Sequence, residues 1–299
     1  MIDTIFDLRI KTFLTLCEEQ SFTKAAQKLF ITQPAVTQQI SSLQKEVGKK
    51  LYTIENRVFN LTKEGHQLRQ FLISLSLNIK KFGDEFYQMG LRKVKFGATR
   101  TIGEFTLPPI IEQMVKHNGS DELFFHIDNT EVLLKMLDKG KIDFAFIEGQ
   151  FDKSAYSYKL FTNHPFIAIG SKRVFEKYKG LPIESLLNER LIVREEGSGT
   201  RRVLEQILKV RGFKITDFKH VDVVANLNVI KHLVKNDLGV SFLYEDGAKR
   251  ALGNGEIYKL QIKDLEITRE FNFVYPLNSL FEEQLLHFYG DALKFYSTI

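Results

Sequence analysis

Short amide and hydroxyl side chains gather on one face of the segment that begins at Gln33. The face comprises Gln33, Thr37, Gln38, Ser41 and Ser42, with Pro34 in the first turn. Such groups hydrogen-bond to base edges and phosphates without carrying a fixed charge. The opposite face is apolar and comprises Val36, Ile40, Leu43 and Val47. A helix divided in this way is suited to the major groove of DNA; a surface helix of an ordinary bundle is the alternative.

Two loops combine hydroxyls, glycines and arginines at places where a strand gives way to a helix. The first, ATRTIGE, holds Thr99, Arg100 and Thr101, and the second, REEGSGTRR, holds Ser198 and Thr200. Hydroxyls and free N–H groups at a helix start form a site for a small anion, whether carboxylate, sulfate or phosphate. Ordinary capping is the alternative for the threonines. Arg100 and Arg201 are equally well explained by solvation or by pairing with acids.

The candidate groove-binding helix belongs to a predicted helix-turn-helix. The preceding helix carries small apolar residues at close-packing spacing, Ala25, Ala26 and Leu29. Ile31 and Thr32 form the turn, and the Thr32 hydroxyl is placed to cap the next helix. Pro34 falls in the first turn of that helix, where a missing N–H costs nothing. A short basic wing follows, so the segment up to Thr62 is predicted to be a winged helix-turn-helix.

The string AAQKLFITQPAVTQQISSLQKEVGKKLY and the following LTKEG resemble the DNA-binding signature of LysR-type transcriptional regulators. This resemblance implies double-stranded DNA as a partner. The family usually has an arginine where this chain has Ile54, which leaves Lys49, Lys50 and Arg57 to contact phosphates. The family binds its effector between two lobes. GSGT matches the usual second-lobe loop, and Thr130 matches a third position at a strand-to-helix junction.

A long segment without proline follows the wing, from about residue 62 to residue 90. Its apolar residues keep a heptad register: Leu68, Leu72, Leu75, Ile79, Phe82, Phe86 and Met89. A narrow seam of this kind is buried against an identical helix of a second copy, whereas a helix lying on its own domain shows a wider apolar face. We therefore predict a homodimer, or a homotetramer built from dimers. Two linked recognition helices predict an inverted-repeat DNA site.

The remaining residues alternate strand-like and helix-like stretches. The order VKFGAT, helix, LFFHI, helix, IDFAFIE is a βαβαβ arrangement, which implies a parallel sheet. A second set begins at PFIAIGS and includes RLIVR, HVDVV and GVSFL, and REFNFVYP with a final helix closes the chain. These lobes resemble the periplasmic-binding-protein-like sensor of LysR-type regulators. The predicted α/β chain comprises a winged helix-turn-helix (1–61), a linker helix (62–90) and a two-lobed sensor (91–299). Lobe I is 91–162 with 267–299, and lobe II is 163–266.

The composition is that of an ordinary globular protein. The 299 residues are 43% hydrophobic and 26% charged, with a net charge of +5, which permits a polyanionic partner without establishing one. No apolar run is long enough to span a bilayer, and the N-terminus lacks the features of a secretory signal, so we expect a cytoplasmic protein. Cys17 is the only cysteine, and its apolar neighbours predict a buried structural thiol.

Enzyme signatures are missing from the sequence. It contains no GxSxG elbow, no phosphate loop ending in GK[ST] and no GxGxxG, and its histidines have no metal-binding spacing. A two-lobed α/β enzyme, or a solute-binding protein with an accessory helical domain, remains the alternative. We expect a non-enzymatic transcription regulator without a cofactor, switched by a small anionic metabolite.

Overall fold

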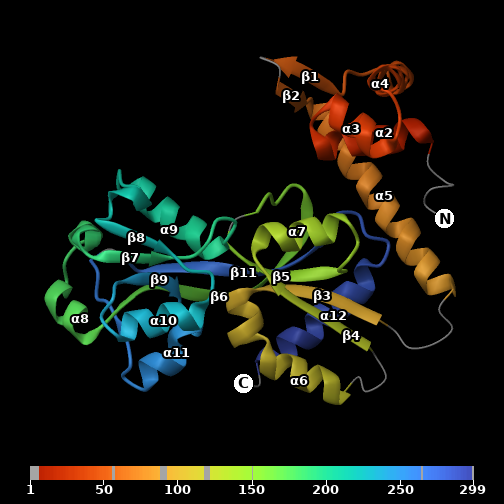
Figure 1. Cartoon of the computed structure of the whole chain (residues 1–299). Helices are drawn as coiled ribbons and strands as arrows, with labels where there is room; N and C mark the ends of the chain where they lie inside the picture. The colour runs from red at the N-terminus through yellow and green to blue at the C-terminus, as the bar shows by residue number, and fades with distance from the viewer. Residues whose placement is uncertain are drawn as a thin grey trace. The chain divides into compact units, whose positions relative to one another are not determined.

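The computed structural model describes residues 7–55, 58–87, 93–117, 122–149, 151–263 and 265–297, drawn in Figure 1. The chain divides into two compact units: Met1–Gly90 with Pro276–Glu282, and Leu91–Tyr275 with Glu283–Ile299. The candidate DNA contact Arg57 and the heptad residue Met89 lie outside the described residues, as does the side chain of Phe86. The lobe boundaries stay a prediction.

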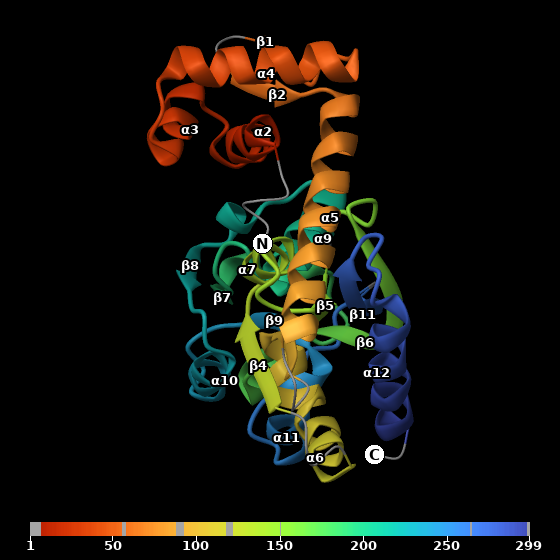
Figure 2. The same cartoon turned by 90° about the vertical axis from the view of Figure 1, so that its right-hand side faces the viewer.

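The first unit is built on a helix-turn-helix and a two-stranded wing. Its elements are α2 (Leu8–Glu19), α3 (Phe22–Leu29), α4 (Gln33–Val47), β1 (Tyr52–Glu55), β2 (Val58–Leu61) and α5 (Lys63–Tyr87). The Thr32 hydroxyl accepts a hydrogen bond from the Ala35 N–H at 3.4 Å, and Pro34 stands in the first turn of α4. Both predictions are confirmed. Figure 2 shows α4 side on, with α2 and α3 packed against it.

The core of this unit lies between α2, α3, α4 and the beginning of α5. Its buried side chains are Phe13, Leu16, Cys17, Ala25, Ala26, Val36, Ile40, Leu43, Leu51 and Leu72. The predicted apolar stripe of α4 is therefore confirmed, except at Val47, which is 43% exposed. Val47 is the last residue of the helix, and Gly48 then turns the chain away in the left-handed conformation. Cys17 is buried as predicted, and burial raises the pKa of its thiol to about 12.

The heptad residues of α5 fall into two groups. Leu72 is buried and packs with Leu68 in the core of its own unit. The expectation that the whole seam is buried against a partner is thus wrong for these two, because the first turns of α5 cover α2. Farther along, Leu75 is 36% exposed and Phe82 is 58% exposed. Phe71, which lies outside the heptad register, is also 58% exposed.

Another side of α5 contacts the segment Pro276–Glu282, which belongs to the same unit. Ser74 Oγ and Asn78 Nδ2 both donate to the carbonyl of Asn278, at 3.2 and 3.1 Å. Ile79 is half-buried. The side of α5 that contacts Asn278 is therefore polar, and the exposed apolar residues Phe71, Leu75 and Phe82 lie on another side of the helix.

The second unit is an α/β fold. Its strands are β3 (Lys93–Thr99), β4 (Glu122–Asp128), β5 (Phe144–Glu148), β6 (Tyr156–Gly170), β7 (Arg190–Val193), β8 (His220–Val223), β9 (Ser241–Tyr244), β10 (Tyr258–Lys259) and β11 (Ile267–Pro276). Its helices are η1 (Ile102–Thr106), α6 (Pro108–His117), α7 (Thr130–Asp138), α8 (Lys172–Tyr178), η2 (Ile183–Asn188), α9 (Gly199–Val210), η3 (Ile215–Asp217), α10 (Leu227–Lys235), α11 (Glu245–Gly253) and α12 (Glu282–Tyr296).

One large sheet runs through this unit, in the order β10-β6-β11-β5-β3-β4, with β9 paired to β6. Strand β3 is parallel to both β4 and β5, as the βαβαβ pattern predicts. Strand β11 is antiparallel to β5. Strands β7 and β8 form a separate parallel pair, which a bridge between Leu191 and Val240 connects to the chain just before β9.

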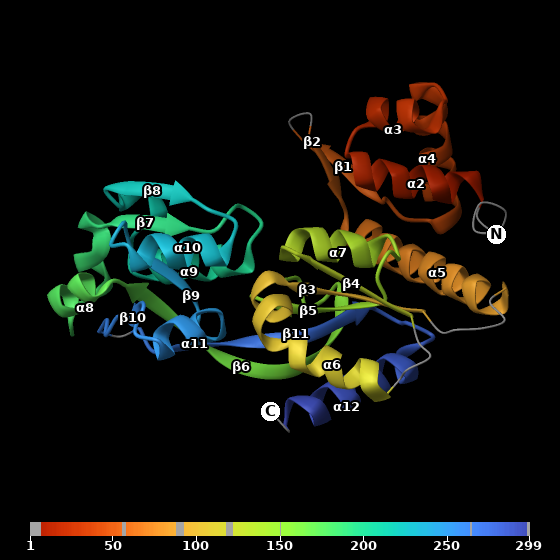
Figure 3. The ribbon, with the colours of Figure 1, turned by 60° about the horizontal axis from the view of Figure 1, so that its bottom comes forward.

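Strand β6 is much longer than predicted. The pattern placed its start at PFIAIGS, whereas the strand begins at Tyr156 and continues for 15 residues. Its first half is mostly exposed or half-buried, so it lacks the continuous apolar run that marked the second half. Figure 3 shows β6 and β11 passing from the group around β3, β4 and β5 to the group around β7, β8 and β9. The two groups thus share these strands.

The helix predicted from Gly103 to His117 is interrupted. A turn of π-helix spans Ile102–Thr106, and α6 starts at Pro108. Pro108 and Pro109 have no N–H to donate, so a continuous helix cannot pass through them. Single π turns are common at functional sites, and this one follows the first of the two loops rich in hydroxyls.

Aromatic side chains fill the core beneath the sheet. The ring centroids of Phe144 lie 4.7 Å from Phe273 and 4.6 Å from Phe288, and Phe96 stacks on Phe144 at 5.2 Å. Each such pair adds about 0.5–1.5 kcal/mol beyond area burial. These contacts fix α12 against β3, β5 and β11, and so hold the end of β5 in a defined place.

Candidate functional site

The proposed DNA-facing side of α4 is open to solvent. Gln33, Pro34, Gln38 and Ser41 are exposed, as are Lys49 and Lys50 just beyond the helix. Thr37 is half-buried, and its hydroxyl donates to the carbonyl of Gln33 at 3.2 Å. Four of the five candidate DNA contacts on α4 are therefore exposed, three through polar side chains and one through the proline ring. Whether they contact bases stays a prediction.

The wing is an antiparallel hairpin that pairs Ile54 with Phe59. Tyr52 stacks on Phe59 at 5.5 Å between ring centroids, and Phe22 of α3 meets Tyr52 edge-on at 5.3 Å. This aromatic contact fixes the wing against the helix-turn-helix. Ile54 is 57% exposed, so an apolar side chain stands where the family has an arginine. The charges near the wing described by the structure include those of Lys49 and Lys50.

The strand-end residues of the second unit converge on Glu148, the last residue of β5. The Thr101 hydroxyl donates to Glu148 Oε1 at 3.1 Å, and the Thr200 hydroxyl donates to the same oxygen at 2.9 Å. The Thr130 hydroxyl donates to the Glu148 carbonyl at 3.4 Å. All four residues are buried. Three predicted effector residues, from three strand-to-helix junctions, therefore meet at Glu148, two at its carboxylate and one at its backbone carbonyl.

These hydroxyls do not act as ordinary helix caps. Thr101 and Ser198 occupy N-cap positions without making a side-chain cap hydrogen bond. The cap of α7 is supplied by Asn129, whose side chain accepts from the Val132 N–H. The capping alternative is therefore wrong for Thr101, whose hydroxyl is directed to Glu148 instead.

Glu148 was missed by the sequence reasoning. It is 2% exposed, and burial raises the pKa of its carboxyl, an effect opposed first by the charge of Arg194 and then by the Thr200, Thr101 and Thr99 hydroxyls. The available signal was an acidic residue that ends an otherwise buried strand, IDFAFIE, directly before a glycine. A carboxylate in such a place is costly unless it is paired or used.

Several other buried polar atoms surround this carboxylate. Within the part of the chain that the structure describes, no hydrogen-bond partner is found for Thr99 Oγ1, Glu148 Oε2, Arg194 Nη1, Ser198 Oγ or Tyr244 Oη. Burial raises the pKa of Tyr244, and the charge of Glu148 raises it further. We call Thr99, Thr101, Thr130, Glu148, Arg194, Ser198, Thr200 and Tyr244 the Glu148 cluster. Unpaired buried donors are rare, and together they suit an oxygen-rich ligand.

The arginines differ in their surroundings. Arg194 is buried, and its Nε and Nη2 donate to the two carboxylate oxygens of Glu195 at 2.8 and 2.9 Å. Arg100 lies 3.7 Å from the Glu195 carboxylate. Arg201 donates to Glu205 at 2.8 Å. Pairing with acids, the alternative considered for Arg100 and Arg201, is thus what the structure has.

Two glycines let the backbones meet beside Glu148. A Cβ on Gly149 would lie 2.9 Å from the Cα of Gly199, and a Cβ on Gly199 would lie 2.6 Å from the Glu148 carbonyl oxygen. Gly149 also has φ of +84°, a conformation that favours glycine. This approach brings the N-terminus of α9 to the end of β5, which is how Thr200 reaches the carboxylate.

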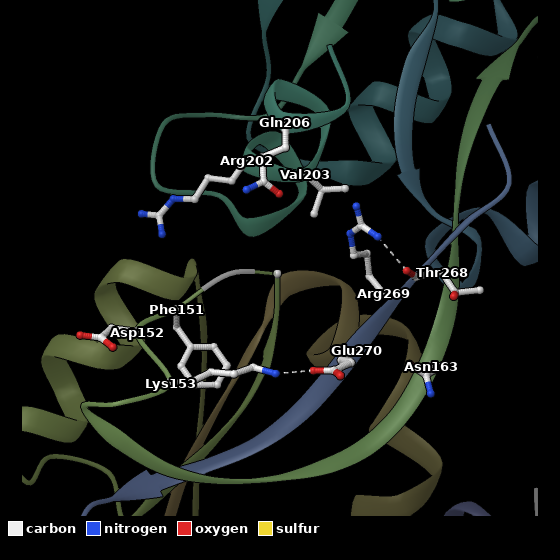
Figure 4. Close-up of a pocket in the computed structure, with 11 residues that line it drawn as sticks. Phe151, Asp152, Lys153, Asn163, Arg202, Val203, Gln206, Thr268, Arg269 and Glu270 are labelled. Atoms are coloured by element: carbon white, nitrogen blue, oxygen red, sulfur yellow. Dashed lines mark hydrogen bonds and ion pairs between the residues drawn. The ribbon is translucent and has the colours of Figure 1, made fainter. Parts of the chain in front are cut away.

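A separate pocket of about 820 Å³ opens near Gly149 (Figure 4). Arg202 and Gln206 of α9 line one side, and Lys153 and Glu270 form an ion pair at 2.7 Å on the other. None of the six predicted effector residues lines it. The pocket and the buried Glu148 cluster are therefore separate sites in the same unit.

Two further properties concern the described ranges as a whole. None of the helices there is long and apolar enough to cross a membrane. Histidine, cysteine and carboxylate side chains do not gather there into a group that could hold a metal ion.

Known proteins share both parts of this arrangement. Residues 8–66 match the family described as "Bacterial regulatory helix-turn-helix protein, lysR family", and residues 90–289 match the "LysR substrate binding domain". The transcriptional regulator CysL of Bacillus subtilis is 29% identical over 272 residues, which cover 89% of each chain.

Solved structures have the same fold. A hydrogen-peroxide-bound mutant of OxyR from Corynebacterium glutamicum has a TM-score of 0.62 at 19% identity, covering 97% of this chain and 92% of its own. The regulatory domain of CcmR from Synechocystis, in complex with 2-PG, has a TM-score of 0.59 at 18% identity, covering 68% and 97%. With a DNA-binding unit and a substrate-binding unit both matched, this chain is a LysR-type transcriptional regulator.

Proposed function

We propose that a small anionic metabolite bound at the Glu148 cluster switches this regulator. The observation that carries the proposal is the set of buried donors without partners, Thr99 Oγ1, Ser198 Oγ and Arg194 Nη1. They lie at the carboxyl ends of strands, where open α/β sheets bind ligands. The N-terminus of α9 adds free N–H groups and a favourable dipole. The 2-PG bound by the regulatory domain of CcmR supports a small-molecule effector in this fold.

We also infer how the protein engages DNA. Phe71, Leu75 and Phe82 expose apolar surface on α5, and a second copy is the partner that would cover it with the same residues. The dimer holds two α4 helices at a fixed separation, and the target is an inverted repeat. Dimers pair into a tetramer. The protein acts in the cytoplasm as a regulator, not as an enzyme.

A thermal-shift screen of small anions, 2-PG among them, tests the effector site on the full-length protein. Thr99→Val and Ser198→Ala should each weaken the binding of a hit by about 1.5–3 kcal/mol, the scale of a lost hydrogen bond to a charged group. Operator binding without effector should persist in both variants, because neither residue lies in the helix-turn-helix. Binding of the hit that is unchanged in both variants would contradict the proposed site.

A further inference from the structure

Glu148 places an acidic group in the middle of a site proposed for an anion. Its Oε1 already accepts from Thr101 and Thr200, and its Oε2 is buried without a partner within the described ranges. Two negative groups confined together at low dielectric repel strongly, and one of them then takes up a proton. An anion that binds beside Glu148 therefore requires a proton on either the ligand or the Glu148 carboxylate.

The neighbouring charges do not remove this requirement. Arg194 is the cation that acts on Glu148, and two of its nitrogens are already engaged by Glu195. Arg100 is directed to the same Glu195 carboxylate. Burial and then the charge of Glu148 raise the pKa of Tyr244, which stays a neutral phenol, although the charge of Arg269 opposes this shift. Two arginines that share the single acid Glu195 leave one positive charge, which cannot neutralise both Glu148 and an incoming dianion.

We propose that the Glu148 cluster binds an oxyanion that shares one proton with Glu148. An oxyanion that keeps an O–H, such as hydrogen phosphate, donates it to Glu148 Oε2. An oxyanion without one, such as sulfate, binds only when Glu148 itself takes up a proton from solvent and donates it. In either case a single O–H lies between the ligand and Oε2. The inference rests on the proposed effector site and adds its ligand class.

The remaining donors fit the other ligand oxygens. Thr99 Oγ1, Ser198 Oγ and Arg194 Nη1 supply hydrogens to unprotonated oxygens, while Oε2 is the acceptor within the cluster. A cluster with several donors and one carboxylate acceptor matches an oxyanion with one hydrogen better than one with none, because in the second case the acceptor would face another acceptor. Glu148 is thus the residue that determines specificity within the site.

Inorganic phosphate and sulfate form a matched pair of probes. They have the same tetrahedral shape, and at about pH 8 phosphate retains one hydrogen and sulfate retains none. Calorimetry with the full-length protein should show phosphate binding at least about tenfold tighter than sulfate. The sulfate dissociation constant should fall about tenfold per pH unit as the pH is lowered towards the pKa of Glu148. Titrations in two buffers of different ionisation enthalpy should report uptake of one proton with sulfate.

Glu148→Gln removes the charge and keeps the shape. This variant should gain sulfate affinity at about pH 8 and lose the pH dependence, while Glu112→Gln, the same change on the exposed face of α6, should behave as wild type. Circular dichroism establishes that both are folded. The inference is overturned if wild type binds sulfate as well as phosphate without proton uptake, if Glu148→Gln leaves the selectivity unchanged, or if neither anion binds either protein. Binding that ignores Thr99→Val as well would sink the proposed effector site too.

Discussion

Replacing Thr200 or Thr101 by valine tests whether Glu148 joins two strand-to-helix junctions of the second unit. Each hydroxyl donates to the same oxygen, Glu148 Oε1, at 2.9 and 3.1 Å. Valine has nearly the shape of threonine, so the change removes the donor and little else. We expect each single variant to lower the free energy of unfolding, because a buried carboxylate loses a partner that it cannot replace with water.

The magnitude follows from the geometry and from the pH. A hydrogen bond to a charged group contributes about 1.5–3 kcal/mol, so a loss of about 2 kcal/mol is expected where Glu148 is ionised. Burial raises the pKa of Glu148 in the folded state, so ionisation of this group costs stability as the pH rises from the unfolded-state pKa through the raised one. The threonines oppose that cost. Their loss should therefore matter more at about pH 8 than at about pH 5.

Urea unfolding followed by circular dichroism measures these changes. The Thr101→Val, Thr200→Val double variant should lose less than the sum of the single losses by about 0.5 kcal/mol or more, because both donors serve one oxygen. Thr268→Val, an exposed position on β11, is the control and should change stability by less than about 0.5 kcal/mol. Single losses as small as the control, or strict additivity at both pH values, would refute the shared-acceptor reasoning.

Three further results are expected from the first unit. Gln38→Ala should relax sequence preference in footprinting more than it weakens nonspecific binding, whereas Lys49→Ala should weaken all sequences and reduce the salt slope by about 1. Leu75→Lys with Phe82→Glu should convert the dimer to monomer in light scattering, because the pair places charges in an apolar seam; an intact dimer would move the interface elsewhere. Because burial raises the Cys17 thiol pKa to about 12, about one thiol in 10⁴ is ionised at pH 8, and labelling of the native protein should be slow until urea is added.

Local signals allowed much of the first unit to be predicted. The cap at Thr32 and the proline at position 34 act within one turn of helix, so their effect on α4 can be read from adjacent residues. The sequence also shows the heptad spacing on α5, but it does not show which of these residues pack within their own unit. Whether Leu72 packs on its own unit or on a second copy depends on where α2 lies, and that is decided by contacts far away in sequence.

The second unit shows the same limit more strongly. Apolar runs located β3 and β5, because buried parallel strands are continuously apolar; the run LFFHI located β4, although this strand is exposed or half-buried. The first half of β6 and the short helices α8 and α11 carry no such run and were missed. Glu148 was read as the end of a strand, since nothing in IDFAFIEG indicates that Thr101 and Thr200, 47 and 52 residues away, donate to it.

The position of Glu148 also suggests how binding of a ligand is converted into movement. Thr200 belongs to α9 and Thr101 to the start of η1, so the carboxylate at the end of β5 links two junctions that no continuous strand connects. A ligand bound as proposed above would weaken the bond that Glu148 accepts from Thr200, while the backbone approach of Gly149 and Gly199 would persist. One such bond, at about 1.5–3 kcal/mol, corresponds to a coupling of roughly 10- to 150-fold. That range is what allosteric effectors usually achieve, so a single carboxylate is sufficient to carry the switch.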